Sequence, residues 1–488
     1  MKKLLALALA ASDRVNPVAV KEFRQAVQSR WVIAVLMLFL LVNLSVMGGY
    51  LMLSPNVEAS IDGGRNIFLF LLSILLITCI GFVPAYSGIR LSLERNDANI
   101  DLFFVTTITP GAIVRGKYFT AMALTLLIFS ACMPFMTLTY LLRGIDLPTI
   151  FGILAFGFVI CAAANALGIF AGSVSGSWLI RGLVDAGAIF WLFCTTFMTI
   201  QMSSSVLMFG RAIMFSRMSA WQFFGWWLGI EVMGIGLLYV LSVALLSPKQ
   251  SNRMLVPRLY IMGSWSVSGA AMAIYSHIEK SADPITTWVV CSGMALIVLT
   301  MTALGERDTW SARVRRTIPH NRMLRLAAFL LYTGSAGGVA WCVLMFAATM
   351  VLGCVGYGVD VEVYHNMPII FGYALCYCLT TAFLRSTVLR NVPTVNLSVV
   401  AAFLGVAVCL VPYLIVFFIG RNWWLVLPWY LLGSPMVLTM TDQAAKNAAQ
   451  LVVIVWFALC MLLSAPWAIS QWRQFTPYQA IAVDKTTQ

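Results

Sequence analysis

Long apolar segments separated by short polar ones fill this chain from one end to the other. Each is near the length of about 20 residues that a helix needs to cross the hydrocarbon core of a bilayer. Because backbone groups inside a bilayer are satisfied only in helices or closed barrels, the pattern predicts an all-α, polytopic membrane fold. We expect about twelve transmembrane helices, at 31–53, 67–89, 118–142, 149–174, 183–202, 223–247, 259–278, 285–304, 326–352, 368–385, 397–420 and 449–471.

The order of these segments predicts two six-helix halves. Each half has its longest internal loop before its third span, and both loops contain Glu-Arg near their start, at Glu94-Arg95 and Glu306-Arg307. The second half is therefore interpreted either as a duplicate of the first or as an added scaffold. The predicted parts are a cytoplasmic start at 1–30, a first half at 31–258 and a second half at 259–488.

Composition and charge sharpen this picture. The 488 residues are 61% hydrophobic and only 10% charged, whereas a soluble chain has about 25% charged residues, so a soluble enzyme is excluded. The net charge is +13, and 24 of the 31 lysines and arginines fall on one side of the membrane if the N-terminus is cytoplasmic. Since basic loops stay in the cytoplasm, both termini are predicted to be cytoplasmic. The positive charge thus reports orientation, and nucleic acid is not an expected partner.

The start of the chain has the pattern of an interfacial helix. Asn16-Pro17 is a favourable helix start, because Asn caps well and Pro fits the first helical position. At helical spacing, Ala19, Val20, Phe23, Ala26 and Val27 share one face, while Lys21, Glu22, Arg24, Gln25, Gln28 and Arg30 share the other. A helix with these two faces lies in the membrane interface just before the first span.

The loop between the second and third predicted spans, residues 90–117, is unusually apolar for a segment in water. It contains Leu102 and the adjacent aromatics Phe103 and Phe104. Such side chains favour either docking into a groove of a cytosolic partner or packing against the protein's own helix ends. Thr109-Pro110 predicts the start of a helix that continues into the third span.

The residues of this loop carry a family resemblance. Glu94, then Asp101-Leu102-Phe103, Thr106-Thr107, Pro110 and Gly116-Lys117 follow each other in the order seen in ABC-2 type permeases. The chain resembles that family over about residues 15–250, and Pro17, Phe23 and Arg24 match its N-terminal interfacial helix. The resemblance implies that Glu94, Asp101, Leu102, Phe103, Phe104, Thr106, Thr107, Pro110 and Lys117 form a loop that docks into a separate ATPase subunit.

The same resemblance implies the rest of the assembly. A cytosolic ABC ATPase subunit would bind ATP and Mg²⁺, and permeases of this kind assemble as homodimers or heterodimers, here in a bacterial inner membrane. The chain itself contains no G-x-x-x-x-G-K-[ST] sequence, so we expect no ATPase activity and no bound cofactor in it. Its three histidines, His277, His320 and His365, lie far apart in sequence, so we expect no metal site either. It departs from simple family members in having twelve predicted spans instead of six.

A few residues inside the predicted spans stand out. Asn165 and Glu231 are candidates for a translocation path, and the alternative is that they are polar groups buried for packing. Glycines spaced by four, at Gly168 and Gly172 and again at Gly225 and Gly229, predict close helix contacts. The arginines between Arg313 and Arg325 either bind anionic lipid or an acidic partner, or only anchor the topology.

Two other functions remain open at this point. Two six-span halves also suit a secondary carrier driven by an ion gradient, although acidic residues inside the spans are few. A membrane scaffold that transports nothing is the third possibility. We expect an ABC transporter permease because the order of residues in the apolar loop resembles that family.

Overall fold

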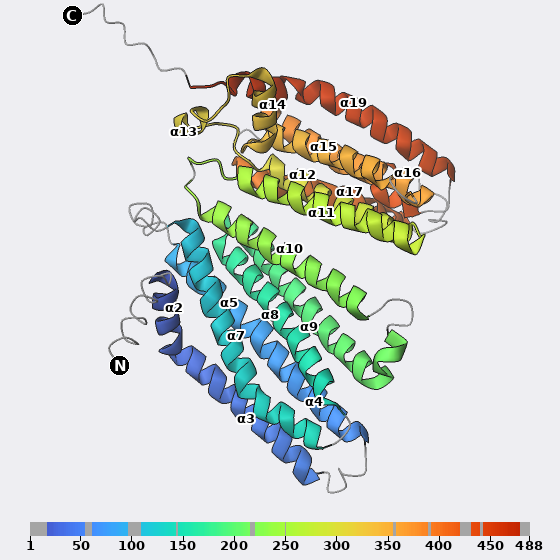
Figure 1. Cartoon of the computed structure of the whole chain (residues 1–488). Coiled ribbons are helices and arrows are strands. Elements are labelled where there is room, and N and C mark those ends of the chain that lie inside the picture. Colours follow the sequence, from blue (N-terminus) through green and yellow to red (C-terminus); the bar gives the residue numbers. More distant parts are fainter. Residues whose placement is uncertain are drawn as a thin grey trace, which may run out of the picture. The chain divides into compact units, whose positions relative to one another are not determined.

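The structure is a computed structural model of the whole chain. Over the described residues, every regular element is helical. The chain divides into two compact units, Met1–Ser247 and Pro248–Gln488, and each is a bundle of helices (Figure 1). The residues that the structure describes are 17–53, 61–95, 109–142, 145–214, 220–248, 250–354, 358–388, 392–419, 431–439 and 443–478.

Unit 1 is organised around the helix α8, which packs against α5, α7, α9 and α10. A five-residue π-helix, η2, joins α4 to α5, so these two form one uninterrupted helical segment. The short helix α2 packs against α7 and α3 at one end of the bundle (Figure 1). The elements of unit 1 are α2 (Pro17–Val27), α3 (Arg30–Leu53), α4 (Ile61–Ile77), η2 (Thr78–Phe82), α5 (Val83–Glu94), α7 (Pro110–Leu141), α8 (Leu147–Ser173), α9 (Trp178–Met214) and α10 (Ala220–Leu246).

Unit 2 is organised around α12 and α16. Helix α12 packs against α11, α15, α16 and α17, and α16 also packs against α17 and α19. The elements of unit 2 are α11 (Leu255–Glu279), α12 (Asp283–Leu304), α13 (Ala312–Arg315), α14 (Arg322–Leu331), α15 (Ser335–Gly353), α16 (Val361–Thr387), η3 (Thr394–Asn396), α17 (Leu397–Ile419), η4 (Leu431–Gly433), η5 (Pro435–Thr439) and α19 (Gln443–Gln474).

The two units repeat the same order of helix neighbours. If α3, α4–α5, α7, α8, α9 and α10 are matched in chain order with α11, α12, α15, α16, α17 and α19, most packing pairs of one unit have a counterpart in the other. For example, α5 packs on α8 as α12 packs on α16, and α8 packs on α10 as α16 packs on α19. Among the described residues, two pairs of unit 1, α3–α7 and α7–α8, lack a comparable counterpart in unit 2, so the two units share most but not all of their helix neighbours.

Ten helices of the described chain are long and apolar enough to cross a membrane. This supports a multi-pass membrane protein. Helices α11 and α17 lie at two more of the predicted spans, 259–278 and 397–420, but are not among the ten. The total of twelve spans and the orientation therefore stay predictions.

One predicted span is wrong in its bounds. The segment 326–352 is not a continuous helix, because the chain is extended at Tyr332 and again at Gly334. The N–H of Gly334 donates to the Glu306 carboxylate rather than to a helical carbonyl. The result is an amphipathic helix, α14, followed by a separate and shorter span, α15.

Glycines bring α5 and α8 into backbone contact. A Cβ on Gly88 would lie only 2.5 Å from the carbonyl oxygen of Gly168, and one on Gly168 would overlap the backbone of Pro84. Gly172 is in the same position against Gly88. The predicted close contact is thus confirmed for Gly168 and Gly172. Among the described residues, nothing lies within 4 Å of a Cβ added at Gly225 or Gly229, so the structure shows no such contact there.

Candidate functional site

The most structured polar site of unit 1 surrounds the first turns of α7. The Thr109 side chain accepts a hydrogen bond from the Ala112 N–H, and Pro110 occupies the first turn, as the sequence predicts. Two turns further on, Gly116 lies against α2, and a Cβ there would come within 2.9 Å of Val18. The absence of a side chain at Gly116 therefore lets α2 lie directly on α7.

The adjacent residue, Lys117, is the centre of a buried ion cluster. Its Nζ lies 2.9 Å from Oε1 of Glu22 on α2 and 2.7 Å from Oε2 of Glu94, the last residue of α5. The side chain of Lys117 is only 2% exposed, and that of Glu22 6%. A buried cation at this depth needs such partners, because desolvation of an unpaired charge costs several kcal/mol. The Glu22–Lys117–Glu94 cluster thus joins α2, α5 and α7.

Arg95, the next residue after Glu94, ties the same end of α5 to the other side of the bundle. Its guanidinium donates to the Ser175 hydroxyl at 2.8 Å and to the Leu245 carbonyl at 2.9 Å. Ser175 lies between α8 and α9, and Leu245 is in the last turn of α10. Glu94 and Arg95 therefore link the C-terminal end of α5 to α7, to the connection between α8 and α9, and to α10.

Helix α2 uses its faces differently from the two-faced prediction. Glu22, expected on the exposed polar face, is buried against α7 together with Ala26. Val20, Phe23 and Val27 are about half exposed. The ion pair with Lys117 turns Glu22 inward and leaves the apolar side chains Val20, Phe23 and Val27 on the exposed side of the helix.

The remaining loop residues, Asp101, Leu102, Phe103, Phe104, Thr106 and Thr107, lie outside the described residues. Their proposed docking role stays a prediction. Of the interfacial helix, Phe23 and Arg24 are exposed on α2, while the side chain of Pro17 is not described. The structure therefore brings together Glu94 and Lys117 of the predicted site, places Pro110 in the first turn of the same helix as Lys117, and adds Glu22 and Arg95.

Unit 1 also contains an apolar cavity of about 680 Å³ between η2, α5, α8 and α9. Ile80, Pro84 and Phe193 are among the side chains that line it, and Arg181 and Asp185 lie in the first two turns of α9. The cavity is open at the surface of the unit, because several of its apolar lining side chains are well exposed, among them Ile77, Ile189 and Phe193.

The two polar residues predicted for a translocation path do not line this cavity. Asn165 is fully buried, and its amide donates to the Thr125 hydroxyl at 2.9 Å across the α7–α8 contact. Glu231 is partly buried on α10. A smaller cavity of about 260 Å³ between α7, α8 and α10 is lined by their chain neighbours, Ala166 and Val232.

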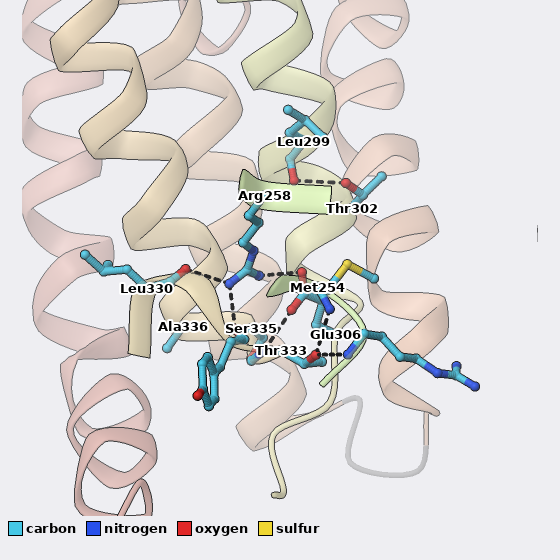
Figure 2. Close-up of polar contacts among 12 residues, drawn as sticks. Met254, Arg258, Leu299, Thr302, Glu306, Leu330, Thr333, Ser335 and Ala336 are labelled. Carbon is cyan, nitrogen blue, oxygen red and sulfur yellow. Dashed lines mark hydrogen bonds and ion pairs between the residues drawn. The ribbon is translucent and has the colours of Figure 1, made fainter. Parts of the chain in front are cut away.

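Unit 2 has a buried ion pair of its own. The guanidinium of Arg258 on α11 lies 2.5 Å from Oε1 of Glu306 and donates to the carbonyl groups of Leu330 and Tyr332, each at 2.7 Å. Figure 2 shows Arg258 reaching toward the end of α14. Burial raises the pKa of Glu306, and the Arg258 charge and the Gly334 N–H partly oppose that rise. The pair fixes the turn between α14 and α15.

Asp308 extends this network toward the C-terminal helix. It accepts hydrogen bonds from Ser335 at the start of α15 and from Gln471 on α19, and it forms an ion pair with Arg385 on α16. The carboxylates that follow α12 are therefore fully engaged within unit 2.

Sequence reasoning missed Glu22, Arg258 and Gln471 as parts of these networks. Their one signal is that each is a polar residue within or next to an apolar segment.

In comparisons with known proteins, the chain matches no family model, no curated protein and no solved structure.

Proposed function

We propose that the chain is the permease subunit of an ABC transporter of the ABC-2 type, driven by ATP hydrolysis in a separate cytosolic subunit. One observation carries the proposal. Glu94 and Lys117, which carry part of the family resemblance, meet in one buried ion cluster with the interfacial helix. Side-chain interactions thus hold the chain on both sides of the apolar loop 96–108.

This arrangement suits a loop that transmits force. Motion imposed on residues 96–108 by an ATPase would reach α5 through Glu94 and Arg95, and α7 through Thr109 and Pro110. The glycine contact between α5 and α8 would pass it on, because helices in backbone contact move together. The cavity between α5, α8 and α9 would change shape as a result, which is how a path alternates its access.

The shared topology of the two units supports a chain that supplies both permease halves, as in a duplicated six-span unit. ATP and Mg²⁺ belong to the partner subunit in this proposal. The site of action is a bacterial inner membrane, with both termini in the cytoplasm. Substrate and direction of transport are left open.

The test is a complex with an ABC ATPase. The tagged chain is purified from its source cells, and a co-purifying Walker-type ATPase is identified by its mass and its ATP turnover. The variant Phe103→Ala/Phe104→Ala should lose most of this ATPase, because buried aromatic anchors dominate such contacts. The variant Trp178→Ala is the control, since it removes an aromatic that is 80% exposed on the same predicted side.

Two outcomes contradict the proposal. One is that the double variant keeps its ATPase but is itself less stable, which means that the two rings pack within the permease. The other is that the chain alone, reconstituted in vesicles, moves a solute down an imposed ion gradient. That second result favours a secondary carrier.

A further inference from the structure

Helices α13 and α14 form, with the residues around them, a rigid cap on one end of unit 2. Both helices pack around Phe475, which is fully buried and lies among the buried side chains of Val314, Ile318 and Phe329. Hydrogen bonds hold the segment in place. The Trp310 indole donates to the Thr333 carbonyl at 2.6 Å, and the Tyr332 hydroxyl donates to the Thr317 carbonyl at 3.1 Å.

This cap carries five arginines without a counter-charge. Residues 309–334 contain no Asp or Glu, and the neighbouring Glu306 and Asp308 are engaged by Arg258 and Arg385. Within the described residues, none of the five guanidinium groups has an ion pair; two lie over aromatic rings, Arg316 over Tyr478 and Arg325 over Trp472. The five are Arg313, Arg315, Arg316, Arg322 and Arg325.

Exposed apolar side chains share α14 with these charges. Met323 is 78% exposed, Leu324 59% and Leu326 48%. Arg322 and Leu326 are four residues apart and so lie on the same face of the helix. The candidate span α15 begins at Ser335, with three residues between it and the end of α14 at Leu331, so a membrane crossed by α15 would have its boundary next to α14.

We propose that the cap binds the head groups of anionic phospholipids. The arginines supply planar, bidentate donors that match phosphate oxygens, and the exposed side chains of α14 enter the adjacent hydrocarbon. The contacts within the cap fix the backbone that carries the arginines, and two of the guanidinium groups rest on aromatic rings, which lowers the entropic cost of binding. An acidic protein would satisfy the charges but not the exposed apolar face at the membrane boundary. The proposal does not depend on the permease function.

The test uses the full chain in nanodiscs of phosphatidylcholine that contain a small fraction of a photoreactive lipid. After illumination, the peptide that covers 312–331 is examined by mass spectrometry for attached lipid. A photoreactive phosphatidylglycerol should label this peptide far more than a phosphatidylcholine with the same reactive group. Equal labelling by the two lipids would overturn the proposal, and it is also the result expected for an acidic protein partner.

A charge variant and two controls complete the design. Arg313→Gln/Arg316→Gln/Arg322→Gln should weaken association roughly 100-fold, as expected for three cations near an anionic surface. Arg313→Lys/Arg316→Lys/Arg322→Lys keeps the charge but loses the bidentate donors. Its labelling by phosphatidylglycerol should lie between that of the unaltered chain and that of the glutamine variant. Lys21→Gln/Arg24→Gln/Arg30→Gln removes three cations from unit 1 and should leave the labelling of 312–331 unchanged.

Each result decides the question. Unchanged labelling in the glutamine variant refutes the site. An equal loss in the unit 1 control shows general attraction to charge and also refutes it. Folding is checked by the reactivity of the buried cysteines Cys342, Cys376 and Cys378 with a thiol dye. If the glutamine variant is unstable, the lysine variant decides: labelling equal to that of the unaltered chain refutes the bidentate site.

Discussion

The Glu22–Lys117–Glu94 cluster predicts that the effect of Glu22→Gln on stability changes sign when Lys117 is also replaced. Replacing Lys117 by Met keeps the length of the side chain but leaves two carboxylates without their shared cation. Glu22 is 6% exposed and Glu94 27%, so water can solvate Glu94 in part and Glu22 hardly at all. Breaking a buried pair by removing one partner costs about 3–5 kcal/mol. We expect Lys117→Met to lie near 3 kcal/mol, because Glu94 is partly solvated.

Replacing the acidic partner Glu22 should destabilise the protein less than replacing Lys117. Glu22→Gln leaves an amide oxygen that still accepts a hydrogen bond from Lys117, and Glu94 still balances the charge. We expect a loss of about 1–2 kcal/mol, the value of a hydrogen bond to a charged group. In the Lys117→Met background, the same Glu22→Gln change should stabilise the protein, because it removes a buried charge that has no partner.

The assay is a titration with sodium dodecyl sulfate in mixed micelles, followed by the reaction of a thiol dye with buried cysteines. Cys79, Cys132 and Cys161 lie in the core of unit 1 and report its unfolding. Arg115→Met is the control, since Arg115 is exposed on the same helix and should change stability by less than about 0.5 kcal/mol. If Glu22→Gln is equally destabilising in both backgrounds, the cluster does not couple α2 to α7 and the reasoning fails.

Three further predictions follow from the fold and the sequence. A cysteine introduced at Asp360 should react with a membrane-impermeant label added from outside, and one at Arg315 should not, in a background without the exposed Cys291 and Cys354; the opposite pattern would reverse the orientation. Gly168→Val should destabilise unit 1 by about 3 kcal/mol, because its side chain would overlap the Pro84 backbone. The control Gly225→Val places its side chain in open space and should be nearly neutral. Equal shifts of the two variants in thermal unfolding would refute the α5–α8 contact. The purified chain should hydrolyse no ATP without a partner, and turnover by a preparation free of contaminating ATPases would contradict this.

The helices could be predicted because apolar length is a local property of the chain. The start of α7 followed from Thr109-Pro110, since capping chemistry involves only neighbouring residues. The break before α15 did not, because the apolar pattern continues through Tyr332 and Gly334 while their backbone is extended. The spacing of glycines predicted close helix contacts only in part. It shows that a helix has a face of small residues, but not whether a second helix packs against that face.

The ion networks lay beyond sequence reasoning for a different reason. Glu22 and Lys117 are distant in sequence, and nothing periodic connects them. The order of residues in the loop pointed to Glu94 and Lys117 individually, but only the fold brings them to one point. Arg258 likewise lies in the first turns of α11, 72 residues before Leu330, whose carbonyl group it binds at the end of α14.

The shortness of α15 sets a limit on the membrane that this protein fits. With 19 residues, the helix is about 28 Å long, close to the hydrocarbon thickness of about 30 Å. The longer helices, such as α7 with 32 residues, adapt to a thicker bilayer by tilting less. Helix α15 has no spare length, because the chain departs from helical geometry at Gly334 before it and the helix ends at Gly353. If α15 spans the membrane, a thicker bilayer would have to thin locally where lipid meets its exposed side, or flanking side chains would have to reach up to the interface, so mismatch at this helix would favour thinner membranes.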